Sequence, residues 1–227
     1  MEPLILSQIQ HIFATKRYCD MDSVEKKIER MVASNGEGKV YFPSDFFDFG
    51  SEKAVSKALQ RLVAREVLLR MHRGLYCSPI IDTEWGIGKM SPNASEVVKA
   101  YAEREGFRYG PCPGAAQNAL GLSEQVVMNP VYTTDGPTRR IRYDEKARPI
   151  VLYHVSPKVF NYKSEVVRLA VIALEDIGRK NLWEYEFDIM QRIFQDIPYA
   201  EIRNDLRTTP SWIRNIIIGF YGSDRNN

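Results

Sequence analysis

The sequence predicts an α+β protein with two domains. Segments with apolar residues at helical spacing alternate with short runs of strand-forming residues around glycine turns, in both halves of the chain. A stretch rich in glycine and proline between residues 79 and 92 separates the halves. We therefore expect an N-terminal extension over residues 1–21, a first domain over residues 22–85, and a mixed α/β second domain over residues 91–227 that ends in helices.

The first predicted helix follows the N-terminal extension. Asp22 is a candidate cap, Glu25 stands three residues later as a capping-box partner, and Asn35 and Gly36 end the helix. The apolar residues of this segment recur at helical spacing: Val24, Ile28, Met31 and Val32. This pattern is typical of an amphipathic helix with one buried side.

A short helix separates this helix from the next long one. Residues 39–42 form a short extended piece, and Pro43 then opens a brief helix over residues 44–48. Three bulky aromatic residues of this segment are expected to fill the core: Phe46, Phe47 and Phe49.

A third helix and a hairpin complete the first domain. Ser51 is expected to cap a helix over residues 52–64. Two apolar-rich strands, residues 67–71 and 75–77, then flank a turn that contains Gly74. Helix, short helix, turn, helix and hairpin is the element order of a winged helix-turn-helix, and we expect this fold for the first domain.

The helix over residues 52–64 has two different faces at 100° per residue. Its apolar face contains Val55, Ala58, Leu59, Leu62 and Val63. Its polar face, together with the capping residue, contains Ser51, Lys53, Ser56, Lys57, Gln60 and Arg61. Long cations reach phosphate or guanine, and a glutamine amide can pair with adenine, so this face suits a recognition helix. The hairpin adds Arg70, His72 and Arg73, which a wing would place against the DNA backbone.

The charge distribution favours double-stranded DNA as the partner of the first domain. The net charge of the chain is only +2, but six basic residues face one acid, Glu66, between Lys53 and Arg73. Exposed cations are usually no more than a solvated surface, and winged folds also serve as protein-interaction modules. Because these cations coincide with the helix-turn-helix order, we expect DNA binding.

The second domain is expected to mix strands and helices. Predicted helices cover residues 94–105, 114–120, 163–178, 183–195 and 212–220, and predicted strands cover residues 107–109, 130–134, 140–143 and 150–155. Asp135 and Gly136 are expected to form a hairpin turn. A candidate second basic patch contains Arg139, Arg140 and Arg142. The alternative is an amphipathic strand whose polar side faces water.

Other classes of function find little support. The chain has no nucleophile elbow, no zinc-protease motif and no phosphate-binding loop, so we expect neither catalytic residues nor a cofactor. Cys19, Cys77 and Cys112 lack metal-ligand spacing and are expected to be free or buried thiols. With no apolar stretch long enough to cross a bilayer and no signal peptide, the sequence predicts a cytoplasmic protein without membrane contact.

Four segments resemble the AbiEi-type antitoxins of bacterial abortive-infection (type IV) toxin–antitoxin systems. They are FPSDFFDFGSEKAVSKALQRLV, LLRMHRGLYCSP, NALGLSEQVVMNPVYTTDG and TRRIRYD, which together run from Phe42 to Asp144. The third segment is the most distinctive of the four. Glu124 and the run from Val126 to Asn129 depart from the pattern of that family.

The resemblance implies an N-terminal winged domain that represses its own operon and a C-terminal domain that counters a toxin. The implied partners are operator DNA and a nucleotidyltransferase-like toxin encoded nearby. The residues at the matching recognition-helix and wing positions are Lys53, Lys57, Arg61, Arg70 and Arg73. The alternative is a solitary winged-helix transcription factor or mobile-element accessory protein, whose second domain mediates dimerisation or protein docking.

Overall fold

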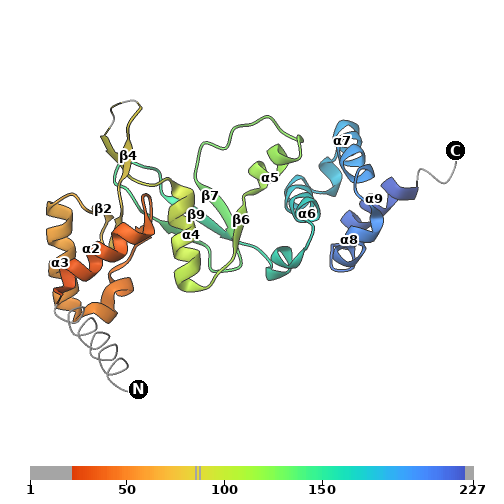
Figure 1. Cartoon of the computed structure of the whole chain (residues 1–227). Helices are drawn as coiled ribbons and strands as arrows, with labels where there is room; N and C mark the ends of the chain where they lie inside the picture. The colour runs from red at the N-terminus through yellow and green to blue at the C-terminus, as the bar shows by residue number, and fades with distance from the viewer. Residues whose placement is uncertain (1–21, 85, 87, 223–227) are drawn as a thin grey trace, which may run out of the picture. The chain divides into compact units, whose positions relative to one another are not determined.

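The computed structural model describes residues 22–84, 86 and 88–222 of the chain. It has the mixed α+β architecture that the sequence predicts, with helices and several small sheets (Figure 1). The predicted extension over residues 1–21 lies outside the described residues. None of the helices in the described part of the chain has the length and apolar character that crossing a membrane requires.

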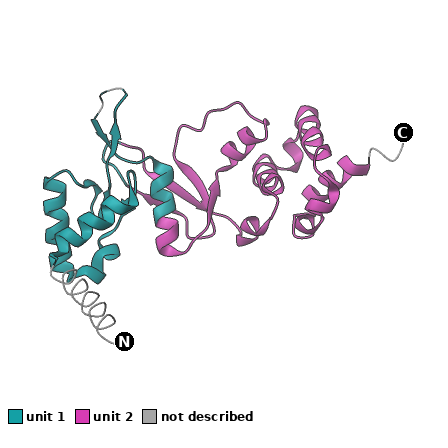
Figure 2. Ribbon diagram, viewed as in Figure 1, with its two compact units in different colours: residues 1–100, 143–146 teal, residues 101–142, 147–227 magenta. Residues whose placement is uncertain are grey.

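The chain divides into two compact units (Figure 2). Unit 1 comprises residues 1–100 and 143–146, and unit 2 comprises residues 101–142 and 147–227. The boundary falls inside helix α4 (Ala94–Glu105) and thus beyond the glycine- and proline-rich stretch in which the sequence predicts it. The reason is that part of that stretch is folded, because strands β4 (Ile80–Asp82) and β5 (Gly88–Met90) form an antiparallel pair.

Unit 1 begins with two helices, a short 3-10 helix between them, and a small sheet. Its remaining elements before β4 are α2 (Val24–Asn35), β1 (Val40–Tyr41), η1 (Pro43–Phe49), α3 (Glu52–Ala64), β2 (Leu69–His72) and β3 (Leu75–Cys77). β3 is the central strand and pairs antiparallel with both β1 and β2. Figure 1 shows α2 and α3 side by side at one end of the unit, and α2 also packs on η1.

The helix caps of unit 1 agree with the sequence at α3 and differ at α2. Ser51 Oγ accepts a hydrogen bond from the backbone N–H of Ala54, as expected for the cap of α3. At α2 the cap is Ser23, whose Oγ accepts from the N–H of Lys26 at 3.3 Å. The cap predicted at Asp22 is therefore wrong by one residue, because Asp22 instead forms an ion pair with Arg30.

The three aromatic residues of η1 do not share one environment. Phe46 is fully buried, and its ring centroid lies 5.5 Å from that of Tyr41 and 6.3 Å from that of Phe49. Phe49 is partly buried against the same core, whereas Phe47 is 41% exposed. The expectation that all three fill the core is wrong for Phe47, since successive residues of a helical turn cannot all face one side.

Unit 2 contains a four-stranded sheet and a helical C-terminal part. Its elements after α4 are β6 (Tyr109–Pro111), α5 (Pro113–Ala119), β7 (Val131–Thr134), β8 (Arg139–Ile141), β9 (Ile150–His154), η2 (Pro157–Asn161), α6 (Glu165–Ile177), η3 (Arg179–Asn181), α7 (Glu184–Gln195), α8 (Tyr199–Leu206) and α9 (Ser211–Gly222). Buried side chains of α5 to α9 form one core, and α5 packs directly on α6.

The sheet of unit 2 has the strand order β6-β7-β9-β8. β7 pairs in parallel with β9, and β8 pairs antiparallel with β9, so β7 and β8 are not partners. The hairpin predicted at Asp135 and Gly136 is therefore wrong. The connection crosses the end of β9 instead, where His154 donates its backbone N–H to Thr138 Oγ1 at 2.9 Å and Gly136 O lies 2.9 Å from His154 Nδ1.

Strand β6 begins at Tyr109, two residues later than predicted. The backbone N–H of Arg108 donates to Asp135 Oδ1 at 2.7 Å, and its side chain donates to Asp135 Oδ2 and to Asn161 Oδ1, also at 2.7 Å. Burial raises the pKa of Asp135, but the hydrogen bonds and charge of Arg108 outweigh this effect and hold the pKa below its usual value. Arg108 thus connects β6 to η2.

Candidate nucleic-acid interface

Helix α3 presents one apolar and one polar face, as its sequence predicts. Val55, Ala58, Leu59 and Leu62 are buried against α2 and η1, while Val63 is partly buried. The candidate DNA-binding residues of α3 all lie at the surface: Ser51, Lys53, Ser56, Lys57, Gln60 and Arg61. Burial of the apolar side fixes the rotation of the helix, so these side chains occupy a common exposed face.

The exposed side chains of α3 differ in whether they form hydrogen bonds or ion pairs within the protein. Lys53, Lys57 and Gln60 have no hydrogen bond or ion pair to another side chain within the described ranges. The hydroxyl of Ser51 caps the helix as an acceptor and still carries a proton that it can donate. Glu52 is also exposed in the first turn, where it reduces the positive potential near Lys53.

Two acids of α2 neutralise the basic side chains at the end of α3. Arg65 forms ion pairs with Glu25 Oε1 at 3.0 Å and with Glu29 Oε1 at 2.8 Å, and Arg61 lies 3.3 Å from Glu25 Oε2. This cluster is not among the features predicted from the sequence. The spacing in the sequence could have indicated it. Glu25 and Glu29 are four residues apart, as are Arg61 and Arg65, so each pair lies on one face of its helix. The side chain of Arg61 is thus less available to a binding partner than that of Lys57.

The cluster has a clear effect on the pKa of Glu25. The hydrogen bond from Arg65 lowers this pKa most, burial raises it, and Arg61 lowers it further, so that the net pKa lies below 4.5. A carboxyl group whose pKa is depressed on folding stabilises the fold above its ordinary pKa. This contribution is lost as the pH falls through the pKa of the folded state, so unit 1 should lose stability in acid.

If unit 1 binds DNA, replacing Glu25 by Gln should strengthen the binding, because it releases Arg61 from its ion pair while Arg65 stays paired with Glu29. One additional phosphate contact contributes roughly 0.9 to the log–log salt slope, so we expect about a three- to tenfold gain in affinity near 0.1 M salt. Fluorescence anisotropy with a labelled duplex at several salt concentrations measures both quantities. Glu96→Gln, at an exposed position of α4, removes the same charge elsewhere in unit 1 and is the control. Equal gains in both variants would mean that only net charge matters.

The hairpin of β2 and β3 exposes two arginines at its turn. Arg70 is exposed and Met71 is buried, because neighbouring residues of a strand face opposite sides, and the register with β3 shifts between Arg70 and His72. Arg73 and Gly74 form the two-residue turn, and Gly74 has φ +74°, a conformation that other residues rarely adopt. Arg70 and Arg73 are exposed, whereas His72 is half-buried.

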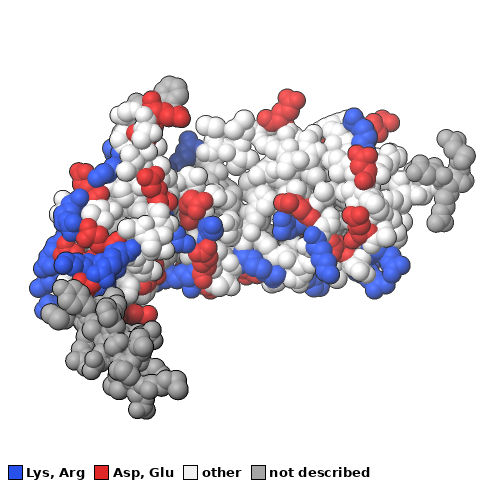
Figure 3. Space-filling model, viewed as in Figure 1, with Lys and Arg blue, Asp and Glu red and all other residues white. Residues whose placement is uncertain are grey.

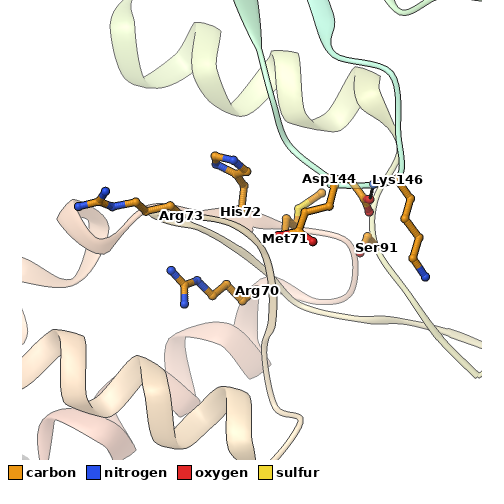
Figure 4. A pocket seen from close by; sticks show the side chains of 8 residues that line it. Arg70, Met71, His72, Arg73, Ser91, Asp144 and Lys146 are labelled. Carbon is orange, nitrogen blue, oxygen red and sulfur yellow. Dashed lines mark hydrogen bonds between the residues drawn. The ribbon is translucent and has the colours of Figure 1, made fainter.

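An open pocket of about 600 Å³ adjoins this hairpin. It has basic and acidic lining residues: Arg70, Met71, His72, Arg73, Ser91, Asp144, Glu145 and Lys146. Figure 4 shows the guanidinium groups of Arg70 and Arg73 extending to one side, while Asp144 and Lys146 lie at the other. The two acids make the pocket itself a poor site for a phosphate group, and the guanidinium groups of Arg70 and Arg73 extend away from Asp144 (Figure 4).

The one acid within the basic cluster of the sequence also has a partner. Glu66 Oε2 lies 2.8 Å from Lys89 Nζ, which also donates to the backbone carbonyl of Glu66. The hydrogen bond from Lys89 lowers the pKa of Glu66. Figure 3 shows Lys and Arg side chains gathered over the α2 and α3 end of unit 1, with acids among them. The surface is therefore a basic face interrupted by paired charges.

The candidate second basic patch is not a single surface. Arg139 and Arg140 are neighbours in strand β8 and therefore point to opposite sides of the sheet. Arg139 is partly buried, pairs with Glu105 Oε2 at 2.7 Å, and lies 5.2 Å from the ring centroid of Phe107. Arg140 and Arg142 remain exposed. The grouping of Arg139 with the other two is thus wrong, because the alternation of the strand separates them.

Two cysteines lie among the described residues, together with the His, Asp and Glu side chains that could bind a metal ion. Cys77 and Cys112 are buried free thiols, as predicted, and burial raises the pKa of Cys77 to about 11. Cys19 lies outside the described residues. Within the ranges that the structure covers, no three His, Cys, Asp or Glu side chains are grouped to hold a metal ion.

The chain matches the model of a known protein family. Residues 27–202 match the model of a family described as "Family of unknown function (DUF6088)". No curated protein and no solved structure matches the chain. The matched segment includes α3, the β2–β3 hairpin and the whole sheet of unit 2. Because the match covers more than half of the sequence, the chain belongs to the DUF6088 family.

Proposed function

We propose that unit 1 is a winged helix-turn-helix that binds double-stranded DNA. The observation that carries the proposal is the exposed polar face of α3, which follows α2 and η1 and precedes the β2–β3 hairpin. In a winged helix-turn-helix this element order places the third helix in the major groove and the hairpin beside it. Lys53, Lys57 and Gln60 are exposed on that helix and free of other described side chains, which supports this assignment.

The side chains divide into two roles under this proposal. Lys57 and Gln60 lie on the exposed face of α3 and read base edges, the lysine as a donor to guanine and the glutamine amide as a partner of adenine. Lys53, near the start of α3, and Arg70 and Arg73 of the hairpin contact phosphates, which positions the protein without specifying sequence. Arg61 and Arg65 contribute less because Glu25 and Glu29 already pair with them.

Two single substitutions test this division of roles. Gln60→Ala should reduce the discrimination between the operator and random duplex by about 1–3 kcal/mol, because a base contact is lost. Arg73→Ala should instead weaken binding to both sequences by a similar factor and reduce the salt slope by about 1, because a phosphate contact is lost. Competition gel shifts with the region upstream of the gene measure both effects. The same pattern of loss in the two variants would mean that α3 does not read bases.

For the biological role, we propose autorepression of the operon and neutralisation of a neighbouring toxin. This part of the proposal rests on the resemblance of residues 42–144 to AbiEi-type antitoxins. The rival is a solitary DNA-binding regulator. Co-expression of the full chain with the adjacent gene product distinguishes the two, since an antitoxin restores growth and a solitary regulator has no toxic neighbour. Changing Lys53, Lys57 and Arg73 together to Ala shows whether any rescue depends on DNA binding.

A further inference from the structure

Unit 2 contains a pocket of about 670 Å³ that the DNA-binding proposal does not use. One wall is the loop between α5 and β7, visible as the long green connection in Figure 1. The opposite wall is one face of the sheet, where Thr133 of β7 stands beside Tyr153 of β9 in the parallel register. The start of α5 and Asp176 of α6 complete the lining. Its volume is within the range of small-molecule sites.

Exposed apolar side chains stand on two walls of this pocket. On the loop, Val126 and Met128 are each 77% exposed, and on the sheet Tyr153 is 51% exposed. Val127 and Val155 also line the pocket. In Figure 3 the region over α5 and this loop carries few charged side chains. A group of apolar side chains that face water around a cavity is typical of a binding site.

The loop is fixed at several points, so the pocket exists without a ligand. Asn118 donates a hydrogen bond to the backbone carbonyl of Gln125 at 2.6 Å, and Arg148 donates to the side chain of Asn129. The loop also packs closely on α5, because a Cβ atom added to Gly114 would lie 3.3 Å from Val127. A pre-formed cavity avoids the entropic cost of ordering a loop when a ligand binds.

Asp176 is the only charged residue among those that line the pocket. Its Oδ2 atom accepts a hydrogen bond from Gln117 Nε2 at 2.8 Å, which orients the carboxylate. Within the described ranges no Lys, Arg or His side chain forms an ion pair with it. The pocket therefore combines two apolar walls with one oriented negative charge.

We propose that this pocket binds a small organic cation, a molecule with an apolar body and a protonated amine. The apolar body lies between the loop and Tyr153, whose ring also attracts a cation, and the ammonium group donates to Asp176. An anionic ligand is disfavoured, since no cation lines the pocket to offset its charge. The inference concerns unit 2 alone and stands independently of DNA binding by unit 1.

Matched pairs of probes test the inference on the full chain. Phenethylamine, tryptamine and 4-phenylbutylamine each have a carboxylate analogue of similar shape: 3-phenylpropanoate, indole-3-propanoate and 5-phenylpentanoate. Isothermal titration calorimetry should show each amine binding about five- to tenfold more tightly than its carboxylate, as expected for one charge-assisted hydrogen bond. Nuclear magnetic resonance spectra should show the largest shifts at Val126, Val127, Met128 and Tyr153.

Two variants separate the charge from the apolar walls. Asp176→Asn keeps an oxygen that can accept from Gln117, so the fold is retained, and the preference for amines should disappear. Asp188→Asn, at an exposed position on α7, removes the same charge and should leave the preference intact. Tyr153→Ser should weaken the binding of both amines and carboxylates, and that of amines more, because the attraction of the ring for a cation is also lost. Equal binding of amines and carboxylates by the unmodified chain overturns the inference. Absence of binding at millimolar concentrations also overturns the inference, and would favour a protein partner for the pocket.

Discussion

Changing Lys53, Lys57 and Arg73 together to Ala is expected to lower the affinity for duplex DNA by roughly 10²–10³-fold near 0.1 M salt. Lys53 and Arg73 each lose a phosphate contact, so the log–log salt slope should fall by about 1.8, and loss of the base contact of Lys57 lowers the affinity further. These three side chains are exposed and have no partner among the described side chains, so their removal leaves no buried group unsatisfied. The variant should therefore keep the stability of the unmodified chain.

A matched variant controls for the change in net charge. Lys158, Lys163 and Arg203 are exposed in unit 2, and changing all three to Ala removes the same total charge. Anisotropy titrations of both variants over a range of salt concentrations give the comparison directly. The proposal requires that only the unit 1 variant lose affinity and slope. If both variants bind DNA equally well, α3 and the hairpin are not the interface.

Phe46→Ala should destabilise unit 1 by about 3–5 kcal/mol, the usual cost of removing a fully buried aromatic ring. Phe46 has no exposed surface and packs against Tyr41 and Phe49, so the substitution leaves a cavity under the helix pair. This loss is a large part of the roughly 5–15 kcal/mol that stabilises a typical domain. Urea unfolding monitored by circular dichroism should show an earlier transition for part of the signal.

The neighbouring residue provides the control for this substitution. Phe47 is 41% exposed on the same 3-10 helix, and Phe47→Ala should change the free energy of unfolding by less than about 1 kcal/mol. DNA binding should be weakened by Phe46→Ala and not by Phe47→Ala, because α3 packs on η1 and is positioned by it. Similar losses of stability in both variants would contradict the different environments of the two rings.

Local patterns in the sequence were sufficient to locate the main helices. The predicted bounds of α3 and α4 agree with the structure, because helical periodicity and caps act within a few residues of each other. α8 was missed: of its buried residues only Ile202 and Leu206 are apolar, so the helix shows little periodicity. Short helices depend on the core that they pack against more than on their own sequence.

Features that depend on distant segments could not be predicted in the same way. The pairing of β7 with β9 joins residues about twenty positions apart, and nothing in the turn at Asp135 and Gly136 indicates that a later strand lies between β7 and β8. The ion pairs of Arg61 and Arg65 with α2 depend on which helical faces meet, which is a tertiary property. By contrast, strand alternation alone separates Arg139 from Arg140 and could have excluded a shared patch.

The central position of β9 has a consequence for synthesis of the chain. Because β9 is the partner of both β7 and β8, a nascent chain that ends between residues 142 and 149 contains both strands but not the one that joins them. Unpaired strand edges of this kind are templates for aggregation. β6 and β7 can pair earlier, but the complete sheet cannot form until translation has passed His154. Proteins that end between residues 146 and 149 should therefore accumulate as aggregates even though all of unit 1 has been made.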